Sequence, residues 1–151
     1  MQGLSLGYFL AIAATVFSGV AIFLAGQRLL KFFLEPMQDF YKLKGEIADS
    51  LIYYANVYLQ PGQRPQQMMQ EAHDTLRQNA SALLAKTQII PFYSVWAFMG
   101  LLPCRQNVFK AHKNLNGLSG GVYGGGGASS DDNERRRTNI VQSLNLDIIE
   151  S

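Results

Sequence analysis

Residues 3–26 read GLSLGYFLAIAATVFSGVAIFLAG, and this stretch decides the fold. It contains no charged side chain, whereas all 13 Lys and Arg and all 11 Asp and Glu of the 151 residues lie from Arg28 onward. A helix of this length, rising about 1.5 Å per residue, would be roughly 36 Å long and could cross a hydrocarbon core of about 30 Å with some tilt. The sequence therefore predicts a transmembrane helix within residues 1–34.

A cleaved signal peptide is the alternative interpretation of this stretch. Such a peptide carries a basic segment before a shorter apolar run, but only Met1 and Gln2 precede this one. Residues 25–28 also continue into residues 29–33 without a polar break. We therefore expect a retained anchor. Because basic residues follow the span and none precedes it, the positive-inside rule predicts an external N-terminus and a cytoplasmic C-terminus.

Small residues form a stripe along the predicted span. They recur at alternating steps of four and three, a period typical of left-handed helix bundles, with bulky Phe and Leu side chains on the opposite side. Small residues are common in membrane helices generally, but in lipid they also allow the close approach that drives helix association. We expect a symmetric homo-oligomer, with a tetramer as the working stoichiometry. The packing or pore-lining residues are Gly7, Ala11, Ala14, Thr15, Ser18, Ala21 and Ala25.

The rest of the chain predicts a small cytoplasmic helical domain over residues 35–116, which makes the fold all-α. Pro36 should kink or end the first helix because it lacks an amide donor. An amphipathic helix is then expected over residues 37–59, a turn at residues 60–65, and an antiparallel helix from residue 65 or 66 to 86. The apolar stripe of the first of these helices consists of Phe40, Leu43, Ile47, Leu51, Tyr54 and Tyr58.

An uncharged segment over residues 87–103 is ambiguous. It is interrupted by Pro91 and Gly100 and is short for a membrane span. Its aromatic residues favour a segment that lies at the membrane interface or caps the helical core, and a second crossing or re-entrant turn is the alternative. The interfacial aromatic residues are Phe92, Tyr93, Trp96 and Phe98.

The C-terminal third predicts a helix, a linker and a second helix. The first helix is expected from residue 103 to about residue 118. Residues 117–130 hold seven of the 14 glycines, a composition typical of a flexible linker. A last helix within residues 131–151, beginning with Glu134 and capped by Asp131 or Asp132, should turn Ile140, Val141 and Leu144 inward.

Motifs of catalysis and metal binding are not apparent in the sequence. His73 and His112 lie on different predicted helices without further ligands at metal spacing, and the glycine run lacks the Lys-Ser or Lys-Thr of a phosphate loop. Cys104, the one cysteine, excludes an internal disulfide and is expected to be a buried or interfacial thiol. We expect no enzyme activity, no cofactor and no metal.

Arg135, Arg136 and Arg137 form the one dense basic cluster. Pairs with Asp131 and Asp132 at helical i, i+4 spacing would make it a solvated helix face. In an oligomer, however, such arginines would gather around one axis and could bind an anionic lipid headgroup, a nucleotide or a short nucleic acid. Further basic candidates for this anionic ligand are Arg105, Lys110 and Lys113.

Several short stretches resemble small bacterial membrane-anchored proteins of uncharacterised function. They are residues 34–36, 45–48, 54–58, 100–103 and 116–119. A short span followed by a small cytoplasmic helical domain is also similar in architecture to membrane effectors of bacterial anti-phage systems. These resemblances imply a single-pass protein of the bacterial inner membrane and name no activity.

Two functions follow as hypotheses. The first is a small homo-oligomeric channel or membrane-permeabilising effector, gated from its cytoplasmic helices. The second is a membrane-tethered scaffold or adaptor without a pore, in which residues 40–58 and the last helix dock a cytoplasmic protein or an anionic ligand. The partners expected are further copies of the chain, the lipid bilayer, and either an anionic nucleotide or nucleic-acid regulator or a cytoplasmic protein.

Overall fold

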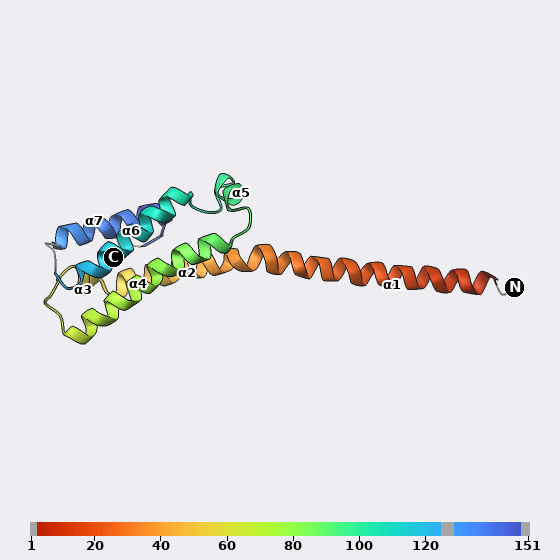
Figure 1. Ribbon diagram of the computed structural model, residues 1–151, viewed down its shortest axis with the longest axis horizontal. Coiled ribbons are helices and arrows are strands. Elements are labelled where there is room, and N and C mark those ends of the chain that lie inside the picture. Colours follow the sequence, from red (N-terminus) through yellow and green to blue (C-terminus); the bar gives the residue numbers. More distant parts are fainter. Residues whose placement is uncertain (1–2, 125–128, 149–151) are drawn as a thin grey trace. The chain divides into compact units, whose positions relative to one another are not determined.

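The computed structural model describes residues 3–124 and 129–148, and these residues are all-helical, as predicted. The chain divides into two compact units, Met1–Pro36 and Met37–Ser151. The helices, labelled in Figure 1, are α1 (Gly3–Leu29), the π-helix η1 (Leu30–Leu34), α2 (Glu35–Tyr53), α3 (Ala55–Tyr58), α4 (Gln66–Ile89), α5 (Tyr93–Phe98), α6 (Arg105–Gly121) and α7 (Ser130–Leu144).

Pro36 was predicted to kink or end the first helix, and it does not end it. The backbone stays helical from α1 through η1 into α2, and Pro36 is the second residue of α2. A proline ring inside an α-helix collides with the carbonyl four residues earlier, which here belongs to Phe32. The single π turn of η1 contains Phe32 and has a wider hydrogen-bonding pattern. We infer that this turn makes room for the ring.

The apolar stripe of α2 and α3 forms one wall of the core, as predicted. Its six residues are between 0 and 6% exposed. The expected single helix is broken at Tyr54, whose backbone leaves the helical region (φ −92°, ψ 13°). The antiparallel pairing of α2 with α4 is also confirmed, because Lys86 Nζ lies 3.7 Å from Asp39 Oδ2 at one end and Asn79 Nδ2 donates to Ser50 Oγ (3.0 Å) further along.

The α4 helix contributes the second wall and packs closely on α6. Ala72, Leu76, Ala80 and Leu83 of α4 are fully buried. Both histidines lie between these helices: His73 Nδ1 is 3.0 Å from Ser119 O, and His112 Nδ1 is 2.9 Å from Ala80 O. The turn before α4 is where it was predicted, and its Gly62 N–H donates to Val122 O at the end of α6 (3.0 Å).

The linker predicted over residues 117–130 is wrong for its first part. The α6 helix runs on to Gly121, and Leu118, Ser119 and Val122 are buried. Residues 125–128 of that prediction lie outside the described residues. Helix persists here because the glycines permit close packing on α7, whose contacts offset the low helix propensity of glycine.

The contact between α6 and α7 is built on two glycines four residues apart. A Cβ added at Gly121 would lie 2.2 Å from Asn133 Oδ1, and one added at Gly117 would lie 3.1 Å from the Arg136 guanidinium. Asn133 is fully buried and donates to Tyr58 O (2.7 Å) and Gly121 O (3.3 Å). One amide thus joins α3, α6 and α7.

The last helix begins at Ser130, before the predicted start at Glu134, and has a different cap. Ser129 is its N-cap and accepts from the Asp132 backbone N–H (3.1 Å), in place of Asp131 or Asp132 as the capping residue. The helix stops at Leu144 because Asn145 takes the left-handed conformation (φ 50°) that is common at helix C-termini. Its inward residues Ile140 and Leu144 are buried, as predicted.

Candidate functional site

The α1 helix carries the predicted packing or pore residues. It lies within a helical run that contains a stretch long and apolar enough to cross a membrane, and none of that stretch is buried inside the structure. The residues predicted to pack are exposed along its length, namely Gly7, Ala11, Ala14, Thr15, Ser18, Ala21 and Ala25.

The two hydroxyl groups of the α1 stripe already have partners. Thr15 Oγ1 donates to Ala11 O and Ser18 Oγ donates to Thr15 O, both at 2.9 Å. Each hydroxyl proton is therefore satisfied within its own helix, while the oxygen can still accept a hydrogen bond from outside. The stripe needs no hydroxyl bond to a second helix, and its main contribution to association would be its small side chains.

The segment 87–103 forms a compact turn structure around the six-residue α5. At about 1.5 Å per residue α5 is about 9 Å long, and of the described helical stretches only the N-terminal one is long and apolar enough to span a membrane. Within residues 87–103 the structure has no helix long and apolar enough for a second crossing, and the burial of Tyr93 in the core agrees with the predicted capping segment.

The four aromatic residues of this segment do not share one environment. Tyr93 is buried (2% exposed) and its OH donates to Pro103 O (2.6 Å), while Trp96 is half-buried and its Nε1–H donates to Pro91 O (3.1 Å). Phe92 and Phe98 point outward and are 67 and 92% exposed. Burial raises the pKa of Tyr93 to about 12, although the nearby Arg105 guanidinium acts in the opposite direction.

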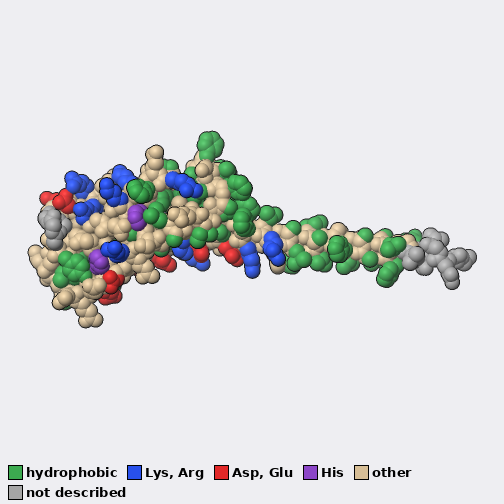
Figure 2. All heavy atoms as spheres, viewed as in Figure 1, with side chains coloured by type: hydrophobic (Ala, Val, Ile, Leu, Met, Phe, Trp, Pro, Cys, Tyr) green, Lys and Arg blue, Asp and Glu red, His purple; other side chains and the backbone are tan. Residues whose placement is uncertain are grey.

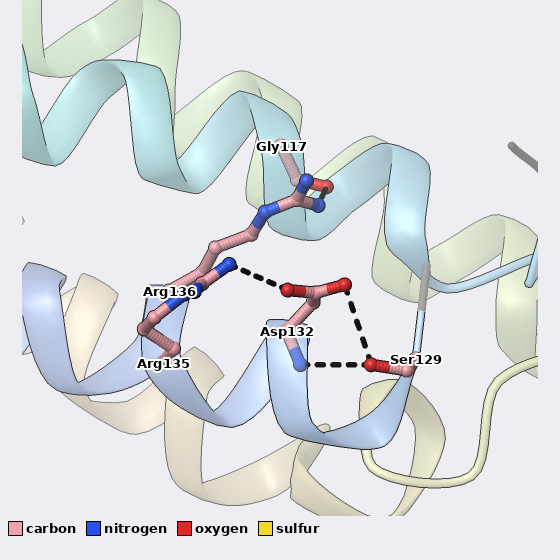
Figure 3. Close-up of polar contacts among 5 residues, drawn as sticks. All are labelled: Gly117, Ser129, Asp132, Arg135 and Arg136. Carbon is pink, nitrogen blue, oxygen red and sulfur yellow. Dashed lines mark hydrogen bonds and ion pairs between the residues drawn. The ribbon is translucent and has the colours of Figure 1, made fainter. Parts of the chain in front are cut away.

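The three consecutive arginines each have a partner inside the chain. Arg135 pairs with Asp132 (2.6 Å), and Arg136 Nη1 reaches across to α6 and donates to Gly117 O (2.5 Å), as Figure 3 shows. Arg137, 17% exposed, pairs with Glu134 (3.1 Å). The i, i+4 pairs expected from the sequence are replaced by i, i+3 pairs and a contact with another helix.

The other basic candidates lie elsewhere. Arg105 is in the first turn of α6, with its guanidinium carbon 5.1 Å from the centre of the Tyr93 ring. Lys110 and Lys113 are exposed further along α6. The structure therefore distributes the predicted anionic-ligand residues over two helices with separate partners.

Cys104 is exposed, so the buried alternative of the expected buried or interfacial thiol is wrong, and the interfacial alternative stays a prediction. It precedes the first turn of α6 and follows the turn structure around α5. Among the described residues, no group of three or more His, Cys, Asp or Glu side chains is placed to hold a metal ion.

A groove between α2 and α4 was missed by the sequence analysis. It has a volume of about 410 Å³ and is polar and acidic, and it is lined by Glu46, Asp49, Ser50, Tyr53, Tyr54, Thr75, Gln78 and Asn79. Its floor is the Asn79–Ser50 hydrogen bond, and Tyr54 OH donates to Glu71 Oε1 (3.2 Å) on its continuation. The sequence did contain a signal for this groove, namely polar residues beside the apolar stripe of α2. These residues alone do not show which helix lies opposite them.

Comparisons with models of protein families, with curated proteins and with solved structures found no match for this chain.

Proposed function

We propose that this protein is a membrane-tethered adaptor, anchored by α1 and binding a second protein through its helical unit. The observation that carries the proposal is the difference in burial between the helical unit and α1. The helical unit closes its own core, with Phe40, Ile47 and Leu115 fully buried, whereas the described side chains of α1 are left exposed. A helical bundle that has its own buried core and is connected to an apolar helix is suited to holding a binding surface at a membrane.

The proposed binding surface lies on the exposed side of residues 40–58, which are part of the docking segment expected from the sequence. The apolar stripe of α2 and α3 is inside the core and cannot contact a partner. The exposed side of α2 instead presents Ile52 and Tyr53, 58 and 71% exposed, and Tyr53 lines the acidic groove between α2 and α4. Glu46 and Asp49 give this groove negative charge, so the partner segment should carry basic and apolar side chains.

Site-directed photo-crosslinking in bacterial membranes tests the adaptor function. A crosslinking residue at Gln78, exposed in the groove, should give one discrete product, whereas one at Gln142, exposed on α7, should not. Replacing Glu46 and Asp49 by Lys should abolish the Gln78 product because the charge of the groove is reversed. Equal crosslinking from both positions, or no change on charge reversal, would contradict the proposed surface.

The expected topology has its own test in the native chain. With an external N-terminus and a cytoplasmic helical unit in the inner membrane, the exposed Cys104 should be protected from an impermeant thiol reagent on intact cells and react after permeabilisation. Labelling of Cys104 on intact cells would instead indicate that the helical unit lies outside the cytoplasm.

A homo-oligomeric channel or membrane-permeabilising effector is the second candidate. It is favoured by α1, which carries no charge before Arg28 and whose stripe of small residues is exposed and available for contact with further copies. Purified protein in liposomes distinguishes the two: a channel conducts ions and an adaptor leaves the vesicles sealed. A monomer in detergent, measured by mass photometry, would exclude the channel.

A further inference from the structure

The helical unit carries a patch of large apolar side chains that its own core does not use. We call it the α5 patch, and Figure 2 shows hydrophobic side chains gathered at the α5 end of this unit. Its six members are between 43 and 92% exposed. They are Ile89, Phe92, Val95, Phe98, Met99 and Leu101. No charged residue lies between Lys86 and Arg105 in the sequence. Contiguous exposed apolar surface of this kind marks a site of interaction.

The patch rests on a well-anchored frame. Tyr93 and Trp96 each donate a hydrogen bond to a backbone carbonyl of the same segment, and Tyr93 is buried in the core. Phe92 has a left-handed backbone (φ 51°), which is uncommon for a residue with a side chain. This conformation, together with Gly100 (φ 77°), turns the chain so that Phe92 and Phe98 face outward.

Within the helical unit, the patch lies beside the point where the chain enters from α1. The unit begins at Met37, and the OH of Tyr41, one turn later, donates to Leu101 O. Asp39 pairs with Lys86 (3.7 Å), a few residues before Ile89. Residues 30–36 connect Met37 to α1, so the patch contacts the part of the helical unit that follows the apolar helix most directly in the chain.

The residues around the patch suit a lipid surface. Trp and Tyr are enriched at membrane interfaces because their rings are apolar at one end and polar at the other. Lys86 and Arg105 border the uncharged segment, and Arg105 is held over the Tyr93 ring at 5.1 Å. Positive charge beside an apolar surface favours anionic headgroups.

We propose that the α5 patch inserts into the boundary between headgroups and acyl chains of the membrane that holds α1, and so provides a second membrane contact. This inference rests on the proposed anchoring by α1. It goes beyond the adaptor function because it assigns a lipid-binding surface to the helical unit itself.

Trp96 is the one tryptophan of the chain, so its fluorescence reports on α5 alone. The full chain is reconstituted in vesicles that contain anionic lipid, brominated at a chosen depth. Because an interfacial segment lies about 5–10 Å into this boundary, bromine near the headgroups should quench Trp96 roughly twofold and bromine near the chain ends much less. Aqueous iodide should quench it weakly.

Phe98→Glu is the informative variant, since a side chain 92% exposed contributes little to folding. It should remove most of the lipid quenching and raise quenching by iodide roughly twofold, because a carboxylate opposes insertion. The control is Met68→Glu, which changes an apolar residue 44% exposed near the start of α4 and should leave both signals unchanged.

The outcomes separate this inference from the anchoring by α1. Flotation of the vesicles after alkaline carbonate washing reports on α1, and protein lost at this step would contradict the anchor. Retained protein whose Trp96 is quenched by iodide but not by brominated lipid would overturn the α5 proposal alone. Retained protein whose Trp96 is shielded from both quenchers would also overturn it, because a second copy or another protein would then cover the patch.

Discussion

The packing of α6 on α7 can be tested with two neighbouring glycines. Gly121→Ala would place a methyl group 2.2 Å from Asn133 Oδ1, 2.9 Å from its Cγ and 3.0 Å from its Nδ2, so the buried amide must move. Gly120→Ala, one residue earlier in the same helix, meets no atom within 4 Å. Both changes replace a helical glycine by alanine, and they differ mainly in the tertiary contact.

The expected magnitudes have opposite signs. Moving Asn133 costs its hydrogen bonds to Tyr58 O and Gly121 O, about 1 kcal/mol each, and overpacking adds about 1–3 kcal/mol. The gain in helix propensity offsets about 1 kcal/mol of this. Gly121→Ala should therefore destabilise the helical unit by about 2–4 kcal/mol, whereas Gly120→Ala should stabilise it by about 0.5–1 kcal/mol.

Thermal unfolding of the full chain in detergent, followed by near-ultraviolet circular dichroism, measures this difference. At about 4–8 °C per kcal/mol for a domain of this size, Gly121→Ala should lower Tm by at least about 8 °C and Gly120→Ala should raise it by a few degrees. Equal shifts in the two variants would refute the close contact between Gly121 and Asn133.

Three further predictions follow from other parts of the chain. In α1, Ala14→Leu should weaken self-association in detergent by filling the stripe of small residues, whereas Val16→Leu on the opposite side should not; equal effects in mass photometry would contradict the stripe. Arg136→Gln should lower the free energy of unfolding by about 1–2 kcal/mol, because its hydrogen bond to Gly117 O is lost. Arg135→Gln should lower it by less than about 0.5 kcal/mol, because that side chain is 75% exposed. Denaturant unfolding of the two variants measures this difference. Burial raises the pKa of Tyr58 from 10.0 to about 12, so the folded state holds this proton more tightly and its contribution is complete below about pH 10 and lost as the pH rises through about 12. Tyr58→Phe should flatten the fall of Tm over that range, and an unchanged slope would show that other groups cause it.

Most of the helical core could be predicted because its signal is local. The spacing of Phe40, Ile47 and Leu51 is periodic, and a periodic apolar stripe must be buried wherever the opposing surface comes from. The turn around Gly62 could also be predicted, because proline and glycine determine the conformation of their own backbone. Helix and turn placement therefore needed no knowledge of tertiary contacts.

The glycine-rich region was mispredicted because composition and position gave opposite signals. Counting glycines indicated a linker, but Gly117 and Gly121 are four residues apart and so share one face of a helix. Such spacing permits close helix packing only if another helix lies opposite, and that helix is α7, which follows in the chain after residues 125–128. The sequence alone did not indicate that Asn133 and Arg136 would contact these glycines.

Helix geometry alone limits how many of the three consecutive arginines can contact one ligand. Successive residues on a helix are turned by about 100° from one another, so three adjacent side chains cannot all point to one ligand from one helix. The structure gives each a different partner: Arg135 remains largely in solvent beside Asp132, Arg136 crosses to α6, and Arg137 is largely buried beside Glu134. An anionic regulator would have to displace Gly117 O or Glu134 to recruit the second or third guanidinium. Since Arg136 also packs against Gly117, such recruitment would loosen the contact between α6 and α7. A polyanion that binds the folded state at this run should raise Tm by mass action, and Arg136→Gln or Arg137→Gln should reduce that rise only if the ligand recruits the replaced guanidinium.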